Sequence, residues 1–510
     1  MREARKSDRP VVPAKPPNKA PEAAEGVEGR GLAKGNTARQ NAARTPRRSP
    51  ALSELAGVRG VARRDRKARF TALFHHLTVE RLRVAFRELN PRAAVGVDGV
   101  SWQQYGEKLE GNLAELHARL QRGAYRARPS RRAYIPKSDG RLRPLGVAAL
   151  EDKIVQRAVV GVLNAVYEKD FLGFSYGFRP GRGQHDALNA LAVGLARKKV
   201  NWVLDADIRG FFDAISHEWL VRFVEHRIGD GRLLRLVKKW LAAGVMEGGE
   251  WKALEEGTPQ GATISPLLAN VYLHYVFDVW VQWWRTRRGR GEVLVVRYAD
   301  DFIVGFQHRR DAEQFREELG ERLARFGLEL HAEKTRLVEF GRFAARSRRQ
   351  RGLPRPDTID FLGFTHICEE HPSSTTMFQL RRLTIRTRLQ RKLRALRIAI
   401  LRRRHLSIPE QGRWLRSIVR GFDHYYAVPS NLRTLIAFRR EVVRHWRRAL
   451  IRRSQKARIT WGRMRRLSKH WLPTARTLHP WPDERFHVNH PRQEPSALVA
   501  HAGIRAGGAG

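Results

Sequence analysis

The stretch VVRYADDFIVGF (residues 295–306) places two adjacent carboxylates, Asp300 and Asp301, between two runs of apolar, mostly β-branched residues. β-Branched and aromatic residues favour strands, and adjacent Asp residues favour a tight turn. We therefore predict a β-hairpin with strands at Val293–Val296 and Phe302–Phe306 and both carboxylates in the turn. Adjacent Asp residues also serve purely local hydrogen bonding in turns, so this stretch alone leaves their role open.

A second acidic stretch, NWVLDADIRGFFDAISH (201–217), alternates in the manner of a strand. The alternation places Trp202 and Leu204 on one face and Asp205 and Asp207 on the other. If this strand lies beside the hairpin, three carboxylates converge, and such a cluster needs a cation to stay ionised. A pair of Mg²⁺ ions prefers oxygen ligands, and could activate a 3′-hydroxyl and stabilise a leaving pyrophosphate. The two stretches together predict nucleotidyl transfer.

The composition indicates a polyanionic partner. The 510 residues include 98 Lys and Arg against 51 Asp and Glu, a formal charge of +47. Neutralising phosphates releases condensed counterions, so nucleic acid is the expected partner. We find no run of about 18 apolar residues, which argues against a membrane. The single cysteine, Cys368, excludes an intramolecular disulfide framework and a multi-cysteine zinc site, and we expect an intracellular protein.

The chain divides by composition into segments of different character. Residues 1–60 are rich in Ala, Gly, Pro and Arg, and predict a disordered basic arm. Apolar spacing predicts a helix near Phe70–Leu77 and a second from Val79 to Leu89, with Thr78 as its N-cap. Between about residues 96 and 364 short strands and amphipathic helices interleave without a steady βαβ rhythm, which predicts an α+β fold.

Beyond about Leu380 the chain becomes basic, aromatic and helical in pattern. From Leu380 to His470 it holds 28 Lys and Arg but only three acidic residues. Amphipathic helices with solvated Arg faces would explain part of this excess, yet its size favours contact with RNA or DNA. Many of the aromatic residues there must form the helix core. After about Pro473 the chain has little apolar content and is expected to fray.

A series of motifs gives the chain a family resemblance. It resembles a group II intron reverse transcriptase/maturase from about Arg66 to Phe486, and its motifs follow the family's order. They are NPRAAVGVDGVS (90–101), RRAYIPKSDGRLRPLGVAALEDKIVQRAV (131–159), FLGFSYGFRPGRGQHDAL (171–188), LDADIRGFFDAISH (204–217), GTPQGATISPLLANVYL (257–273), VRYADD (296–301), GLELHAEKTRLVEF (327–340) and IDFLGF (359–364). Each motif alone is weak, but their order makes the resemblance specific.

The resemblance implies a right-hand polymerase. Fingers and palm would occupy residues 61–370, an α-helical thumb with a basic maturase (X) domain residues 371–480, and a flexible tail residues 481–510. Many relatives carry an endonuclease with cysteine pairs after this point. The lack of such pairs resembles the bacterial, endonuclease-lacking forms, so we expect a location in the bacterial cytoplasm. The motif HVNHPR (487–492) is more often incidental than a metal site.

Carried over residue by residue, the resemblance implies that Asp207, Asp300 and Asp301 hold the two Mg²⁺ ions. Asp205 is left out, because the family motif aligns on the Asp of "DI". Phe212 would stand against the sugar's 2′ position and favour deoxyribonucleotides, although ordinary core packing is its alternative role.

The nucleotide site implied by the resemblance has further members. Lys137 and Arg143 would hold the incoming triphosphate, since Arg grips phosphate bidentately while Lys supplies a point charge. Gln260 and Gly261 would lie against the template-primer and nucleotide, where a residue without Cβ allows close approach. Gly261 could also be an ordinary turn glycine with no contact to the nucleotide. Lys334 would lie near phosphate.

We therefore expect an RNA-directed DNA polymerase that copies intron RNA and also binds its host group II intron RNA to assist splicing and mobility. Its partners would be intron RNA, an RNA template with a DNA primer, dNTPs and target DNA. Two alternatives stay open: an RNA-binding splicing cofactor with a decayed polymerase, and a reverse transcriptase recruited for defence or diversification.

Overall fold

The computed structural model describes residues 54–136, 142–253, 256–258, 261–371, 374–454 and 458–489. Lys137 and Gln260, two residues of the predicted site, lie outside these ranges. Within them, helices are mixed with three sheets, which confirms the α+β class.

The central sheet contains both acidic stretches. Its strand order is β6-β7-β3-β8, and every neighbouring pair is antiparallel. The predicted hairpin is confirmed, since β6 pairs with β7 in a register that sets Tyr298 opposite Asp301. The strands are β3 (Trp202–Ala206), β6 (Val293–Tyr298), β7 (Asp301–Phe306) and β8 (Arg336–Glu339).

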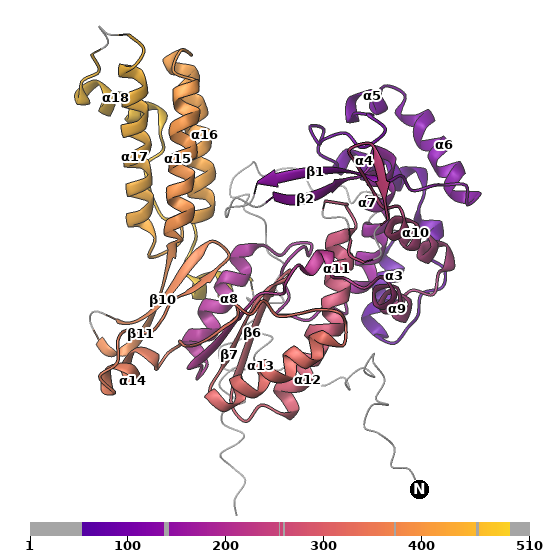
Figure 1. Cartoon of the computed structure of the whole chain (residues 1–510), viewed down its shortest axis with the longest axis horizontal. Coiled ribbons are helices and arrows are strands. Elements are labelled where there is room, and N and C mark those ends of the chain that lie inside the picture. The colour runs from indigo at the N-terminus through magenta and orange to yellow at the C-terminus, as the bar shows by residue number, and fades with distance from the viewer. Residues whose placement is uncertain are drawn as a thin grey trace, which may run out of the picture.

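Both faces of the central sheet are buried, because the hairpin strands are apolar at every second position on each side. Leu294 and Val296 pack with α8 (Gln184–Arg197), whereas Val295 packs in the core that also contains α13 (Arg309–Ala324). The opposite face is also covered by α11 (Ser265–Leu273), a π-helical segment η3 (His274–Asp278) and α12 (Val279–Arg287). The sheet therefore lies as a layer between α8 on one side and α12 and α13 on the other (Figure 1).

The N-terminal lobe is mainly helical and carries a second sheet of order β2-β1-β4-β5. Polar caps define several helix starts: the Thr78 side chain accepts from Arg81 N, as predicted, and Asp230 caps α10. The β1–β2 hairpin extends from this lobe toward the C-terminal helices (Figure 1). The elements are α3 (Ala56–Arg64), η1 (Phe74–His76), α4 (Val79–Glu88), α5 (Trp102–Glu107), α6 (Leu109–Gln121), β1 (Ser130–Pro136), β2 (Leu142–Val147), α7 (Leu150–Tyr167), η2 (Phe211–Asp213), α9 (His217–Arg227), α10 (Gly231–Ala242), β4 (Val245–Glu247) and β5 (Glu250–Lys252).

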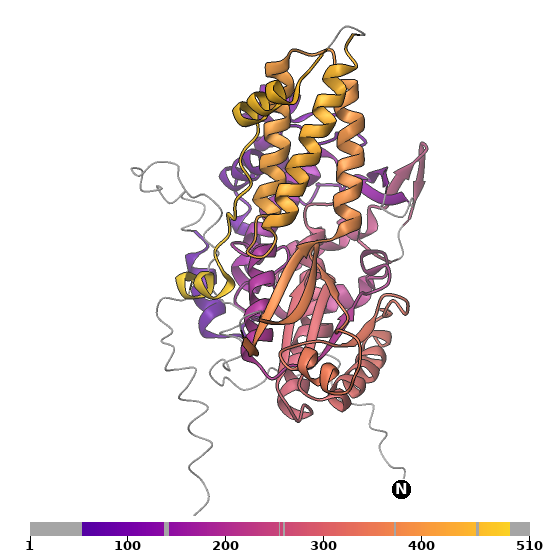
Figure 2. The same ribbon diagram turned by 90° about the vertical axis from the view of Figure 1, so that its left-hand side faces the viewer.

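The helical module, defined as α15–α18, follows a third sheet of order β11-β10-β9. Figure 2 shows its long helices standing side by side above the sheets. Aromatic and aliphatic residues including Phe422, Phe438 and Trp446 form its own core. The elements are α14 (Ala344–Gln350), β9 (Ile359–Phe361), β10 (Phe364–His371), β11 (Ser374–Thr384), α15 (Arg386–Arg402), α16 (Ile408–Tyr426), α17 (Leu432–Ile451), α18 (Trp461–Trp471) and α19 (Pro482–Asn489).

Three boundaries differ from those predicted. Helix α3 begins at Ala56, inside the expected arm, and the helix predicted near Phe70–Leu77 is reduced to the short η1 because Phe70 instead bridges to Ile228. Strand β10 spans residue 370 and β11 continues to Thr384, so the helical part begins at Arg386.

The C-terminal segment is also ordered where fraying was expected. Helix α19 packs on α8, with ion pairs from Asp483 to Arg197 (3.0 Å) and from Arg485 to Asp186 (2.8 Å). The second half of HVNHPR, residues 490–492, lies outside the described residues. No helix within the described ranges has the length and apolar character needed to span a membrane.

Candidate active site

The central sheet brings the three predicted carboxylates to one edge. Strand β3 pairs antiparallel with β7, which confirms the expectation that the second acidic stretch lies beside the hairpin. Ala206 is opposite Phe302, so the next positions outward, Asp207 and Asp301, are neighbours at the same end of the sheet. Asp300 lies in the hairpin turn, whereas Asp301, predicted in the turn as well, is the first residue of β7. Residues almost 100 positions apart in the chain therefore converge.

Burial and neighbouring carboxylates raise the pKa of Asp300 and of Asp301. Desolvation, then the charge of Asp207, raises the pKa of Asp300. Desolvation, then the charges of Asp300 and Asp207, raises the pKa of Asp301 to about 7. Asp301 is exposed to solvent, and the negative charges of Asp300 and Asp207 disfavour its ionised form. The group therefore favours a positive partner.

Two of the predicted cationic residues lie at this group. The Lys334 ammonium is 2.5 Å from Asp207 Oδ2. Arg143, on the exposed end of β2, lowers the pKa of Asp300 through its charge. The structure thus places Lys334 against a carboxylate, and it brings Arg143 from the N-terminal lobe to the same place.

A further cation, Arg388, was not predicted from the sequence. It lies in the first turn of α15, and its charge acts to lower the pKa of Asp301. Its guanidinium interacts with the Tyr426 hydroxyl, and both groups lie 3.3 Å from where a Cβ on Gly363 would be. Nothing in the motif pattern singles out Arg388, because it reaches the site only through the packing of the helical module.

A buried arginine fixes the hairpin turn. Arg297 is fully buried and donates to both carboxylate oxygens of Asp278, at 2.7 and 2.6 Å. It also donates to Asn270 Oδ1 (3.0 Å), Ser175 Oγ (2.7 Å) and the backbone carbonyl of Ala299 (2.9 Å). The last bond holds the residue that precedes Asp300. Sequence analysis missed this role, although a lone Arg within the apolar run VLVVRY was a signal for it.

The loop before α8 lies directly against the turn. A Cβ on Gly177 would fall 2.2 Å from the backbone nitrogen of Ala299, so only glycine fits this approach. Asn270 donates to the Gly177 carbonyl at 2.7 Å. The turn is therefore supported from the hairpin, from α11 and from this loop.

Phe212 and Gly261 were predicted to contact the nucleotide or the template. In the structure both residues contact other parts of the protein. Phe212 is partly buried against the first core, with its ring centroid 5.3 Å from that of Phe211. Gly261 has φ +110°, and a Cβ there would lie 2.9 Å from the Gly146 carbonyl oxygen of β2. The close approach expected at Gly261 thus exists, and it is to the protein backbone.

The donor chemistry suits a hard divalent cation. In the arrangement that the described ranges show, no group of three or more His, Cys, Asp or Glu side chains is spaced to hold a metal ion, and Lys334 neutralises Asp207. Carboxylate oxygens are nevertheless the ligands that Mg²⁺ prefers, and a cation would relieve the repulsion that raises the pKa of Asp300 and Asp301. The type of donor therefore suits the expected metal, although the described side chains in this arrangement are not spaced to hold it.

The helical module shows which aromatic residues are structural. Trp446 and Phe438 are fully buried, which confirms that many of these residues form the core. Trp461 is instead 48% exposed, with the Arg447 guanidinium 4.5 Å from its ring centroid. An Arg paired with an exposed indole is a surface suited to unstacked bases.

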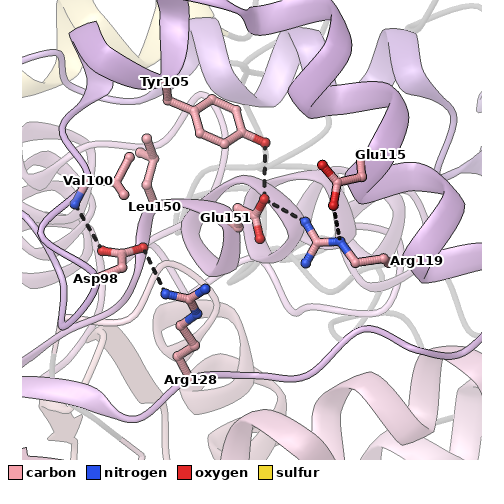
Figure 3. Close-up of a pocket in the computed structure, with 8 residues that line it drawn as sticks. All are labelled: Asp98, Val100, Tyr105, Glu115, Arg119, Arg128, Leu150 and Glu151. Carbon is pink, nitrogen blue, oxygen red and sulfur yellow. Dashed lines mark hydrogen bonds and ion pairs between the residues drawn. The ribbon is translucent and has the colours of Figure 1, made fainter.

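A cavity of about 290 Å³ lies between α5, α6 and α7, and none of the three carboxylates lines it (Figure 3). Its charges are paired within the wall: Arg119 contacts Glu151 at 2.7 Å and Glu115 at 3.6 Å, and Arg128 contacts Asp98 at 4.0 Å. Each carboxylate in the cavity wall thus has an arginine partner within the protein, so the cavity charges are neutralised without a ligand. Its lining residues are Asp98, Val100, Tyr105, Glu115, Arg119, Arg128, Leu150 and Glu151.

Comparisons with known proteins agree with the carboxylate geometry. Residues 135–366 match the family model described as reverse transcriptase (RNA-dependent DNA polymerase). The chain is 38% identical over 239 residues to protein YkfC of Escherichia coli, and 35% identical over 209 residues to the group II intron-encoded protein LtrA of Lactococcus lactis. Over this region the chain is similar to reverse transcriptases of the group II intron type.

The match to these relatives is partial in length. The alignment with YkfC covers 41% of this chain and 62% of YkfC, and that with LtrA covers 40% and 34%. The nuclear intron maturase 3 of Arabidopsis thaliana is 31% identical over 126 residues, 24% of this chain and 17% of the maturase. The chain thus spans less than two thirds of the curated relatives that it matches. The region of this chain that matches the reverse transcriptase model contains the carboxylates, Arg143 and Lys334.

Proposed function

We propose that the chain is an RNA-directed DNA polymerase, which extends a DNA primer with dNTPs along an RNA template. The single observation that carries the proposal is the convergence of Asp207, Asp300 and Asp301, from two separate acidic stretches, on one edge of the central sheet. In this proposal the central sheet is the palm, the N-terminal lobe with the β1–β2 hairpin is the fingers, and α15–α18 are the thumb and maturase domain.

The three carboxylates would hold two Mg²⁺ ions. Bound Mg²⁺ lowers the pKa of the primer 3′-hydroxyl and neutralises charge on the triphosphate. The chain's own residues would position the reactants: Arg143 would orient a triphosphate, Lys334 would hold Asp207, and Arg297 would fix the backbone that carries Asp300. The charge of Arg143 at Asp300, the Lys334–Asp207 ion pair and the bond from Arg297 to the Ala299 carbonyl support these roles. Lys137 and Gln260 are proposed to join them, and Phe212 to bound the sugar site.

We also propose that the helical module binds structured RNA, in particular a host group II intron, to assist splicing and mobility at a DNA target. Its support is the excess of Lys and Arg together with the exposed Trp461 beside Arg447. Two relatives are named a group II intron-encoded protein and an intron maturase. The complete carboxylate trio favours an active polymerase over a splicing cofactor whose polymerase has decayed. Intron RNA structure in the flanking DNA would argue against recruitment for defence.

The test is primer extension on an RNA template with Mg²⁺ and dNTPs. Wild type should extend the primer, and Asp300→Ala should reduce extension by about three orders of magnitude, because metal stabilisation is worth several kcal/mol. Asp357→Ala, at an exposed aspartate in the loop after α14, is the matched control and should be as active as wild type.

Intron-RNA binding by each protein separates the two proposed activities. Asp300→Ala should bind RNA as wild type does, because the basic helices are unchanged. A wild type that stimulates intron splicing but extends no primer would disprove the polymerase and support the cofactor alternative.

A further inference from the structure

Four non-glycine residues in the described ranges have positive φ, and only one of them lacks a reason in the fold. Ala299 (φ 59°) is small and buried in the carboxylate turn, and Leu362 (46°) packs against the second apolar core. Ser430 (72°) uses its hydroxyl to accept from Arg382 N at 3.1 Å. Phe178 (57°) is bulky, 48% exposed and outside the three apolar clusters.

The conformation of Phe178 is imposed by fixed neighbours. Gly177 on one side lies against the backbone of Ala299 and accepts from Asn270. Arg179 on the other side is buried, donates to two backbone carbonyls at 2.7 Å and pairs with Glu168 at 3.0 Å. Phe178 is therefore held in place between two anchored residues.

This arrangement is unfavourable for the fold itself. A Cβ in the left-handed region meets the following carbonyl, and a bulky residue there is a true outlier. The exposed ring recovers little by burial, and among the described residues it makes no ring–ring or cation–π contact. Such outliers persist where the surrounding structure enforces them, often at functional sites. Phe178 directly follows the glycine that contacts the carboxylate turn, and holding an exposed ring there at this cost points to a ligand for the ring.

We propose that Phe178 is a positioning residue whose ring supports the terminal nucleotide of the primer strand. This inference rests on the proposed polymerase function. The primer is the favoured occupant because Gly177 contacts the residue before Asp300, and extension requires the 3′ end at that turn. An aromatic face accepts any base or sugar, as a polymerase that copies varied sequences needs.

The test compares Phe178→Gly, Phe178→Ala and Phe178→Trp in primer extension. Glycine accepts φ 57° freely, alanine keeps the steric cost without the ring, and tryptophan keeps an aromatic face. Gly and Ala should each lower kcat/KM about tenfold, chiefly through the KM for primer–template, and Trp should retain it. The melting temperature of Phe178→Gly should not fall below that of wild type, since relief of strain offsets the added chain entropy. Phe343→Ala, at an exposed phenylalanine before α14, is the control and should leave both kcat/KM and the melting temperature unchanged.

A fluorescent base analogue locates the contact. With 2-aminopurine at the primer terminus, Phe178→Gly should change the emission of the bound complex, and with the analogue at the opposing template position it should not. A change only on the template strand would overturn the primer assignment. Wild-type kcat/KM in Phe178→Gly, or a fall in its melting temperature by several degrees, would overturn the inference while polymerase activity stands. A wild type no more active than Asp300→Ala would instead remove the proposed function and this inference together.

Discussion

The carboxylate sheet and the helical module both depend on arginine but use it in opposite ways. In the sheet, Arg297 is fully buried, and its guanidinium bonds to three side chains and a backbone carbonyl. In the module, arginines such as Arg391 and Arg394 remain at the surface, and apolar and aromatic residues form the core. One arginine in the sheet therefore determines local geometry. The many surface arginines of the module together create a positive electrostatic potential.

Removing the buried arginine should give the largest effect. Arg297→Met leaves Asp278 charged and fully buried without its partner, so unfolding in denaturant should show a loss of about 3–5 kcal/mol. Primer extension should fall as well, because the Ala299 carbonyl loses a donor.

The double variant Arg297→Met/Asp278→Leu separates the two consequences. Removing both charges should restore much of the stability, since an apolar pair can replace a buried ion pair. Extension should stay low, because the turn still lacks its bond. If the double variant regained full activity, Arg297 would act on stability alone.

Local patterns were enough to predict three of the four strands of the central sheet, but not β8. Alternating residues predicted the hairpin, and the order of motifs identified the strand that would lie beside it, so Asp207, Asp300 and Asp301 could be named in advance. The partner of Arg297 could not be named, because Asp278 lies in a π-helical segment that nothing in the apolar spacing indicates. The role of Arg388 likewise depends on how α15 docks.

The ends of the chain were predicted least well. Composition indicated a fraying tail after Pro473, yet His479 is buried and its ring stacks on His185 of α8, with centroids 3.9 Å apart. A short apolar-poor segment gains its order from a partner surface far away in the sequence. Such contacts leave no periodic signal.

This junction between the sheet and the module should be sensitive to acid. His185 is buried beside His479, His424, Arg382 and Arg485, and desolvation followed by these charges lowers its pKa to about 3. The folded state therefore disfavours the protonated ring, whose ordinary pKa is about 6.5. The stability that the neutral ring provides is present above pH 6.5 and is lost progressively as the pH falls toward 3.

Denaturant unfolding at pH 7.5 and 5.5 measures this loss. The contribution of His185 should be about 1.4 kcal/mol at pH 5.5, following from tenfold preferential protonation of the unfolded chain. His185→Phe keeps a stacking ring and should reduce the pH dependence, leaving the part due to His479, whose pKa is also lowered. An unchanged pH dependence in this variant would place the titrating group elsewhere.

Neutralising exposed arginines of the module should give the smallest effect per residue. Arg391→Gln/Arg394→Gln on α15 removes two surface charges, so stability should stay within about 0.5 kcal/mol of wild type. Affinity for intron RNA should fall roughly fourfold per charge at 0.15 M salt, and the slope of log affinity against log salt should become shallower by about one unit per lost phosphate contact. The matched control, Arg316→Gln/Arg325→Gln on and just after α13, changes the net charge equally outside the module. Equal losses in the two double variants would mean that overall charge attracts RNA, whereas a loss confined to α15 would make the module a binding surface.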